Sequence, residues 1–201
     1  MDTFSENDAH PNPFIQFKHW YDQALDDPDI VEPTAMTVAT VTTEGKPTAR
    51  VILLKHFDEH GFAFFTNYHS RKGEEISKTP WVCLNFWWGK LAKQIRIEGS
   101  IEKSTPEASD EYFQSRPRGS QLGAWASDQS QVITDRQALE EKLQHVTQQY
   151  GDQTVPCPPH WGGYLVKPNL FEFWQGRENR LHDRLRYQLQ NDQWHIDRLS
   201  P

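Results

Sequence analysis

The sequence predicts a mainly β protein, an antiparallel barrel of six to eight strands with flanking helices. Segments in which apolar and polar residues alternate recur along the chain, and Gly, Pro, Asn and Asp turns separate them. Segments with helical spacing are fewer and stand between the strands. A large antiparallel sheet removes its exposed edges by closing on itself, so a barrel is the expected architecture.

One domain accounts for the chain. Its 201 residues are enough to bury a substantial core, and the 12% of aromatic residues supply large buried areas. We expect residues 1–13 to form a polar, flexible leader and residues 14–201 to form the domain. The leader has neither a basic start nor an apolar run, and no apolar stretch of about 18 residues occurs anywhere. These features predict a cytoplasmic protein.

Capping residues and apolar spacing predict four helices. The first carries apolar residues at spacings of three and four, namely Phe14, Phe17, Tyr21 and Leu25. Ser70 caps a second, short helix that ends before Pro80. Thr105, followed by Pro106, begins a third helix that ends at Arg116 and Pro117. The fourth, residues 135–150, has one apolar face made of Leu139, Leu143 and Val146.

Strand character is found between these helices and after them. The segments are residues 35–41, 48–55, 61–66, 81–88, 91–103, 162–166, 170–175, 184–190 and 194–199. The first two form a hairpin through a turn at residues 44–47, and the last four read as a meander.

Charge and cysteine usage exclude several classes of protein. The formal net charge is −7, so the molecule as a whole repels nucleic acid and anionic membranes. An anionic ligand therefore requires a local cluster of cations. Cys83 and Cys157 lie far apart without metal-ligand spacing, so we expect two free thiols and no bound metal.

The usual nucleotide and hydrolase signatures are missing. No GxGxxG follows a strand, and neither GxxxxGK[ST], HExxH nor GxSxG occurs. A Rossmann or P-loop enzyme is thereby excluded, and metal-dependent hydrolysis and acyl transfer have little support.

Four clusters of cations remain as candidate anion sites. Arg50 and Lys55 stand at the two ends of the segment RVILLK; five residues apart in a strand, they point to opposite faces, so solvent is as plausible a destination as a ligand. Ser70, Arg71 and Lys72 begin a helix, where free backbone N–H groups favour a phosphate, although a solvated turn would have the same sequence.

The third cluster, SRPRGS at residues 115–120, places guanidinium and hydroxyl groups in a loop after Tyr112. Arginine suits bidentate phosphate recognition, while a basic surface loop is the alternative.

The fourth cluster lies within FWQGRENRLHDRLRY at residues 173–187. Arg180, His182, Arg184 and Arg186 recur with period two and share one face if the segment is extended. Four cations on one face repel each other, which favours a site for an anionic ligand, with Trp174 as a flat surface for a ring. A strand that faces solvent is the alternative.

The segments RVILLK, FFTNYHSRK, KQIRIEG, EYFQSRPRGSQLGAWAS, QS and FWQGRENRLHDRLRY occur in this order between about Pro33 and Pro201. Together they resemble the pyridoxine/pyridoxamine 5′-phosphate oxidase family. The resemblance implies an FMN-binding split barrel that works as a homodimer, with each flavin at the subunit interface. It also implies oxidation of pyridoxamine and pyridoxine 5′-phosphate to pyridoxal 5′-phosphate, with reduction of dioxygen to hydrogen peroxide.

The resemblance further implies two sets of site residues. The FMN set is Arg50, Val51, Ile52, Leu53, Leu54, Lys55, Phe65, Thr66, Arg71, Lys72, Gln94, Gln129, Ser130, Trp174 and Arg184. For the substrate, Lys55, Tyr112, Arg116 and Ser120 would hold the phosphate, while Arg180 and His182 would position the pyridine ring for catalysis.

Two departures from the family pattern concern the site. Phe65 stands where some members have Tyr, and the leader lacks the basic arm that covers the site in some relatives. Two other functions fit the same segments. One is a related split-barrel flavin oxidase that acts on another aromatic compound, such as a phenazine, and the other is a noncatalytic carrier of FMN or pyridoxal phosphate.

Overall fold

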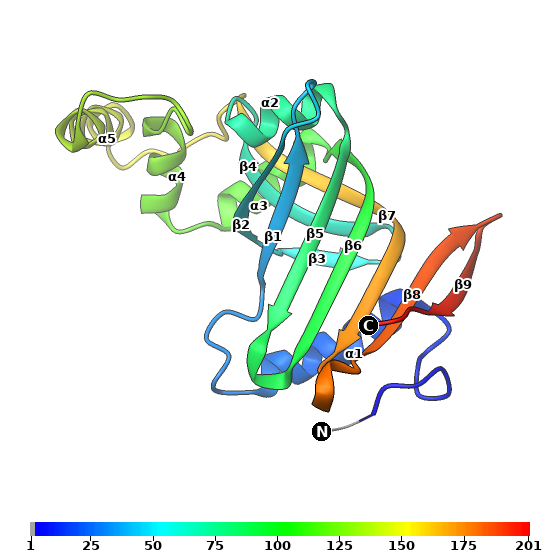
Figure 1. Cartoon of the computed structure of the whole chain (residues 1–201). Helices are drawn as coiled ribbons and strands as arrows, with labels where there is room; N and C mark the ends of the chain where they lie inside the picture. Colours follow the sequence, from blue (N-terminus) through cyan, green and yellow to red (C-terminus); the bar gives the residue numbers. More distant parts are fainter. Residues whose placement is uncertain (1–2) are drawn as a thin grey trace.

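The structure is a computed structural model that describes residues 3–201 (Figure 1). Over these residues, nine strands form one antiparallel sheet in the order β2-β1-β5-β6-β7-β4-β3, with β8 joined to β7 and β9 joined to β8. The strands are β1 Ala35–Val41, β2 Pro47–Leu53, β3 His56–Asp58, β4 Gly61–Asn67, β5 Trp81–Trp88, β6 Lys93–Lys103, β7 Trp161–Gln175, β8 Asp183–Gln190 and β9 Gln193–Arg198. The mainly β, antiparallel class expected from the sequence is confirmed.

Helices flank the sheet. They are α1 Pro13–Asp26, α2 Arg71–Lys78, α3 Pro106–Ser115, α4 Arg118–Ala126 and α5 Arg136–Tyr150, with short 3₁₀ turns η1 Gly89–Leu91 and η2 Glu178–Arg180. Ser70 caps α2 by accepting from the N–H of Gly73, and Thr105 caps α3 by accepting from the N–H of Ala108, as the sequence predicts.

Strand β7 organises the sheet. It pairs with β6 from Tyr164 to Gln175, while its first half pairs with β4 and its second half with β8. The register with β6 shifts between Glu98 and Gly99, opposite Pro168. A Cβ on Gly99 would lie 2.1 Å from the carbonyl oxygen of Lys167, so only glycine permits this close approach. The bulge bends the strand and curls the sheet into an open barrel (Figure 1).

The core lies between the concave face of the sheet and α1. Phe17, Trp20 and Ala24 of α1 are buried, whereas Leu25, which the sequence pattern placed on the inner face, is 50% exposed. The inward stripe follows Phe17, Trp20 and Ala24 at spacings of three and four, which turns Leu25 outward. Ahead of the helix, Phe4 is buried against the rings of Trp20 and Phe173, at centroid distances of 4.9 and 6.3 Å.

Helix α4 was expected to be a loop, and that expectation is wrong at residues 118–120. Its two glycines lower the intrinsic helix propensity. Packing overrides this tendency, because Leu122 and Ala126 are buried in a small second core with Phe113, Val155 and Trp161. Helices α4 and α5 project beside the barrel (Figure 1), and on α5 only Val146 of the expected apolar face is buried.

The meander also differs from the expectation in one respect. Residues 162–166 and 170–175 belong to the single strand β7, with Pro168 at the bulge rather than at a break. Cys83 and Cys157 are both free. Among residues 3–201, no helix is long and apolar enough to cross a bilayer.

Candidate functional site

A pocket of about 740 Å³ opens where β2 and β4 lie without pairing to each other. Of the residues expected at the site, it is lined by Arg50, Val51, Ile52, Leu53, Lys55, Phe65, Thr66, Lys72, Tyr112, Arg116, Ser120 and Gln129. The structure therefore brings together most of the residues expected to bind the cofactor and all four residues expected to bind the substrate phosphate. They come from β2, β4, α2, α3, α4 and the adjoining loops.

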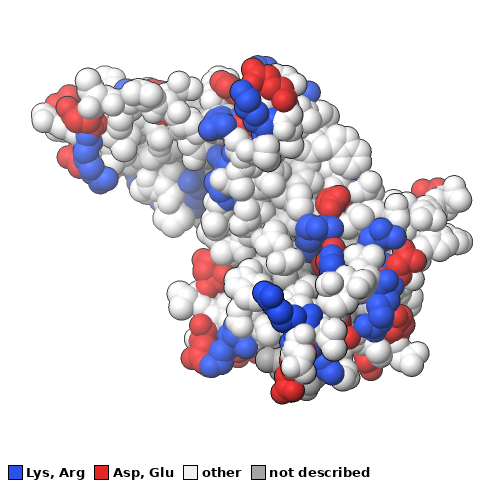
Figure 2. Space-filling model, in the orientation of Figure 1, with Lys and Arg blue, Asp and Glu red and all other residues white. Residues whose placement is uncertain are grey.

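The pocket is cationic in an acidic protein. Arg50, Lys55, Lys72 and Arg116 line it, and no carboxylate does, among the residues the structure describes. Figure 2 shows blue side chains gathered in the hollow between the α4–α5 lobe and the barrel. Since the chain carries a net charge of −7, this concentration of cations is a local exception and is suited to an anion.

Lys72 is the most deeply placed of these cations. It is only 7% exposed, and its Nζ donates to Thr66 Oγ1 at 3.0 Å, to Ser70 Oγ at 3.2 Å and to Gln129 Oε1 at 3.0 Å. All three acceptors are neutral. Burial, with a smaller contribution from the nearby charge of Arg50, lowers the pKa of Lys72 to about 8. A buried ammonium group without a carboxylate is suited to an anionic ligand.

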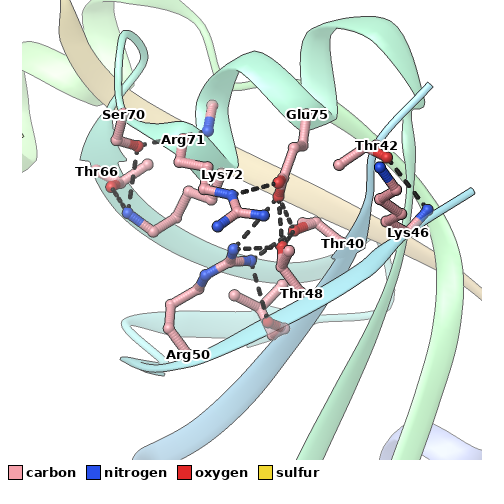
Figure 3. Close-up of polar contacts among 12 residues, drawn as sticks. Thr40, Thr42, Lys46, Thr48, Arg50, Thr66, Ser70, Arg71, Lys72 and Glu75 are labelled. Atoms are coloured by element: carbon pink, nitrogen blue, oxygen red, sulfur yellow. Dashed lines mark hydrogen bonds and ion pairs between the residues drawn. The ribbon is translucent and has the colours of Figure 1, made fainter. Parts of the chain in front are cut away.

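Arg50 and Arg71 are held by one buried carboxylate, Glu75 (Figure 3). Arg50 NH2 lies 3.3 Å from Glu75 Oε2, and Arg71 Nε lies 2.9 Å from Glu75 Oε1. Burial tends to raise the pKa of Glu75, but hydrogen bonds from Thr40, Thr48 and the two arginines outweigh it and lower the pKa to about 2. The carboxylate is therefore ionised at neutral pH.

Arg116 rests on aromatic rings instead of an acid. Its guanidinium carbon lies 4.5 Å from the ring centroid of Trp161 and 5.6 Å from that of Phe113. Its NH1 is buried without a hydrogen-bond partner, and burial lowers the pKa of the group. Phe65 and Tyr112 stack beside it with centroids 3.9 Å apart. The guanidinium is thus available to an anion in the pocket.

Arg50 and Lys55 were expected to point to opposite faces, so that only one of them could face a given ligand. This expectation is wrong, because both residues line the same pocket. Alternation holds only within a strand, and β2 ends at Leu53. Leu54 belongs to the buried core and does not line the pocket. Arg71 and Ser130 also lie outside the pocket lining, next to the lining residues Lys72 and Gln129.

The remaining predicted residues form a second group. Gln94, Trp174 and Arg184 are direct cross-strand neighbours on β6, β7 and β8. The ring of His182 lies 4.5 Å from that of Trp174, and its Nδ1 accepts from the backbone N–H of Arg177 at 3.1 Å. This hydrogen bond leaves Nε2 as the ring nitrogen that can carry a proton toward a ligand.

The prediction of four stacked cations on one extended face is wrong. Arg180 lies in η2 with a φ of 62°, outside β8, and is exposed. Arg184 Nε donates to Glu172 at 2.8 Å and Arg186 NH2 donates to Asp197 at 2.7 Å, from the neighbouring strands. These carboxylates remove the repulsion on which the prediction depended.

The two groups stand at opposite ends of β7. Trp161, at the first residue of the strand, lines the pocket, whereas Trp174 is one residue from its end. One chain therefore does not bring Arg180 and His182 to the cationic pocket. The outer face of the sheet between the groups exposes large apolar side chains, among them Val51 at 67% and Trp87 at 56%. Such a face is typical of an interface between subunits.

Sequence reasoning missed Glu75 and Trp161. A glutamate four residues after Arg71 on a predicted helix is a recognisable ion-pair signal, so Glu75 could have been found. Trp161 carries no such local signal, because its partner Arg116 is distant in the sequence.

Two protein-family models match the chain. One, described as pyridoxamine 5′-phosphate oxidase, matches residues 24–150, and the other, described as the pyridoxine 5′-phosphate oxidase C-terminal dimerisation region, matches residues 161–201. Curated proteins named pyridoxine/pyridoxamine 5′-phosphate oxidase are similar over nearly their whole length. The protein of Cyanothece sp. is 57% identical over 99% of this chain and 93% of its own length, and that of Gloeothece citriformis is 57% identical over 98% and 92%.

Solved structures share the fold. PhzG from Burkholderia lata 383, in complex with tetrahydrophenazine-1-carboxylic acid, superposes with a TM-score of 0.92 at 31% identity and covers 100% of this chain and 98% of its own. A pyridoxamine 5′-phosphate oxidase-related, FMN-binding protein from Nostoc punctiforme has a TM-score of 0.73 at 19% identity, over 92% and 97% of the two chains.

Proposed function

The chain belongs to the pyridoxine/pyridoxamine 5′-phosphate oxidase family, and we propose that it oxidises pyridoxamine and pyridoxine 5′-phosphate to pyridoxal 5′-phosphate with FMN and dioxygen. The observation that carries this proposal is the pocket lined by four cations and no carboxylate among the described residues. Both FMN and the substrate bear a phosphate, so two anionic groups have to be held close together.

The residues present fit FMN. Lys72 is a buried ammonium group with only neutral acceptors, and it follows the capping residue at the N-terminus of α2, where backbone N–H groups favour a phosphate. Lys72, Arg50 and Arg71 would hold the cofactor phosphate. When bound, FMN would supply a ring that takes two electrons from the substrate and returns them to dioxygen.

The chain's own residues bind and orient the substrate in this scheme. Lys55, Tyr112, Arg116 and Ser120 line the pocket and would hold the substrate phosphate. Arg116 is suited to this role because its buried NH1 has no other hydrogen-bond partner. The scheme requires no strong general base, so orientation of the C4′ carbon is the main contribution of the protein.

A second copy of the chain would complete the site. The matched dimerisation region, residues 161–201, contains Trp174, His182 and Arg184, which one chain places away from the pocket. In a homodimer these residues, with Arg180, would reach the pocket of the partner across the apolar outer face. Within that site His182 would donate from Nε2 to the substrate ring.

A related oxidase of another aromatic compound is the second candidate, since PhzG with its bound phenazine derivative is 31% identical and superposes closely. A phenazine carboxylate has a single negative charge and no phosphate, so it gives less reason than a phosphate for the pair of cations Arg116 and Lys55. The higher identity to the named oxidases, 57%, also favours the B6 vitamers. A cytoplasmic location stays a prediction from the sequence.

Absorbance spectroscopy followed by oxygen consumption tests the proposal. We expect a yellow dimer that forms peroxide with pyridoxamine or pyridoxine 5′-phosphate and not with the dephosphorylated vitamers. A colourless dimer would contradict the assignment, as would equal turnover of the unphosphorylated forms. Yellow protein without turnover would indicate a carrier, and turnover of tetrahydrophenazine-1-carboxylic acid alone would indicate the second candidate.

A further inference from the structure

A cluster of polar side chains joins α2 to β1 and β2 beside the pocket, and Glu75 lies at its centre (Figure 3). Glu75 Oε2 accepts from Thr40 Oγ1 at 2.5 Å, from Thr48 Oγ1 at 2.7 Å and from Arg50 at 3.3 Å, while Oε1 accepts from Arg71 at 2.9 Å. One carboxylate thus links three elements of the fold. Its side chain is 7% exposed, which leaves little room for water to replace these donors.

Arg50 is fixed by the same cluster. Its NH1 donates to Thr40 Oγ1 at 2.5 Å and its NH2 donates to Thr48 Oγ1 at 2.7 Å, the two hydroxyls that also bind Glu75. The guanidinium group is therefore oriented through NH1 and NH2 while the residue lines the pocket. Arg71 has a flexible, largely exposed side chain, and its bond to Glu75 restrains the end that carries the charge.

We propose that Glu75 is a positioning residue that orients Arg50 and Arg71 toward the phosphate of the cofactor, an inference that rests on the proposed use of FMN. The charge of Glu75 by itself opposes this role, because a carboxylate beside the pocket repels a phosphate. If Glu75 acts by positioning the arginines, its neutralisation should weaken FMN binding. If only its charge matters, the same change should strengthen FMN binding.

Glutamine at residue 75 breaks the cluster without a change of size. All four groups that bind Glu75 are donors, so both of its oxygens act as acceptors. The amide of glutamine offers one acceptor and one donor, and its NH₂ has to face either Arg71 or the donors from β1 and β2. One of the two arginines then loses its restraint.

Binding of FMN and of riboflavin to the apoprotein separates the two roles. Riboflavin lacks the phosphate, so loss of orientation should weaken FMN binding and spare riboflavin. We expect E75Q to bind FMN about tenfold more weakly or worse, and riboflavin within about threefold of the unaltered protein. The matched control is E74Q, which removes the same charge from the exposed neighbouring residue of α2 and should leave FMN binding within about threefold.

Thr48→Val provides a second variant that leaves every charge in place. It removes one donor to Glu75 and one acceptor for Arg50 and retains a β-branched side chain in β2. We expect FMN binding to weaken about threefold or more, again with riboflavin spared. If E75Q does not fold, the FMN and riboflavin affinities of Thr48→Val test the proposal instead.

The proposal is overturned if E75Q binds FMN as tightly as the unaltered protein or more tightly. It is also overturned if E75Q weakens the binding of FMN and of riboflavin by the same factor. It is overturned equally if Thr48→Val leaves FMN binding unchanged. Failure of the proposed function would look different: the unaltered protein would either bind no FMN or bind it without oxidising a B6 vitamer. In the second case the role of Glu75 would stand.

Discussion

Replacement of Lys72 by methionine should separate the stability of the apoprotein from its capacity to bind FMN. The lysine is buried, its pKa is lowered from 10.5 to about 8, and a difference of this size corresponds to roughly 3 kcal/mol of cost for the charged form in the folded apoprotein. Methionine has a similar length and no charge. The three acceptors of Nζ include Thr66 and Ser70, which keep other partners in Gln129 and Asn67.

We therefore expect apo K72M to be more stable than the unaltered apoprotein by about 1–3 kcal/mol at pH 7, and to lose FMN. The sign of the pH dependence follows from the lowered pKa. Between about pH 8 and pH 10.5 the unfolded chain holds a proton that folded Lys72 has released, so the stability of the unaltered protein rises with pH there. The excess stability of apo K72M over the unaltered apoprotein is therefore full below pH 8 and becomes smaller above it.

Urea unfolding of the two apoproteins at pH 7 and pH 9.5, at one protein concentration, measures both effects. Lys78→Met is the matched control, because Lys78 lies at the exposed end of the same helix. A K72M apoprotein that is less stable than the unaltered one, or an advantage that grows with pH, would refute the reasoning. So would undiminished FMN binding by K72M.

Four further substitutions test other parts of the site and fold. R180A should lower turnover about 10- to 100-fold and keep the flavin, whereas R71A should chiefly release flavin; equal loss of flavin would disprove the division into two sets. W161L removes the ring under Arg116, so the KM for the phosphorylated vitamers should rise about tenfold with kcat little changed in oxygen-consumption assays. G99A places a Cβ 2.1 Å from a carbonyl oxygen of β7 and should lower the free energy of unfolding by more than about 2 kcal/mol in urea; a smaller loss would show that the bulge relaxes.

The features that could be predicted from the sequence depend on residues that are close together in the chain. The alternation of the strands and the helix caps at Ser70 and Thr105 each extend over a few positions, and both were confirmed. The family motifs are likewise short segments, and the family that they indicate was confirmed. Helix α4 shows the limit of such signals, because its glycines favour a loop whereas burial of Leu122 and Ala126 favours the helix.

The composition of the site depends on contacts between distant residues. Arg50 and Lys55 share a pocket because β2 ends at Leu53, where alternation stops. Arg184 is neutralised by Glu172 across a strand pair, which the sequence around it does not reveal. Local residue order thus determined which elements form and which cations are available. Only tertiary packing decided which cations meet in one pocket, because charge pairing and burial act through space rather than along the chain.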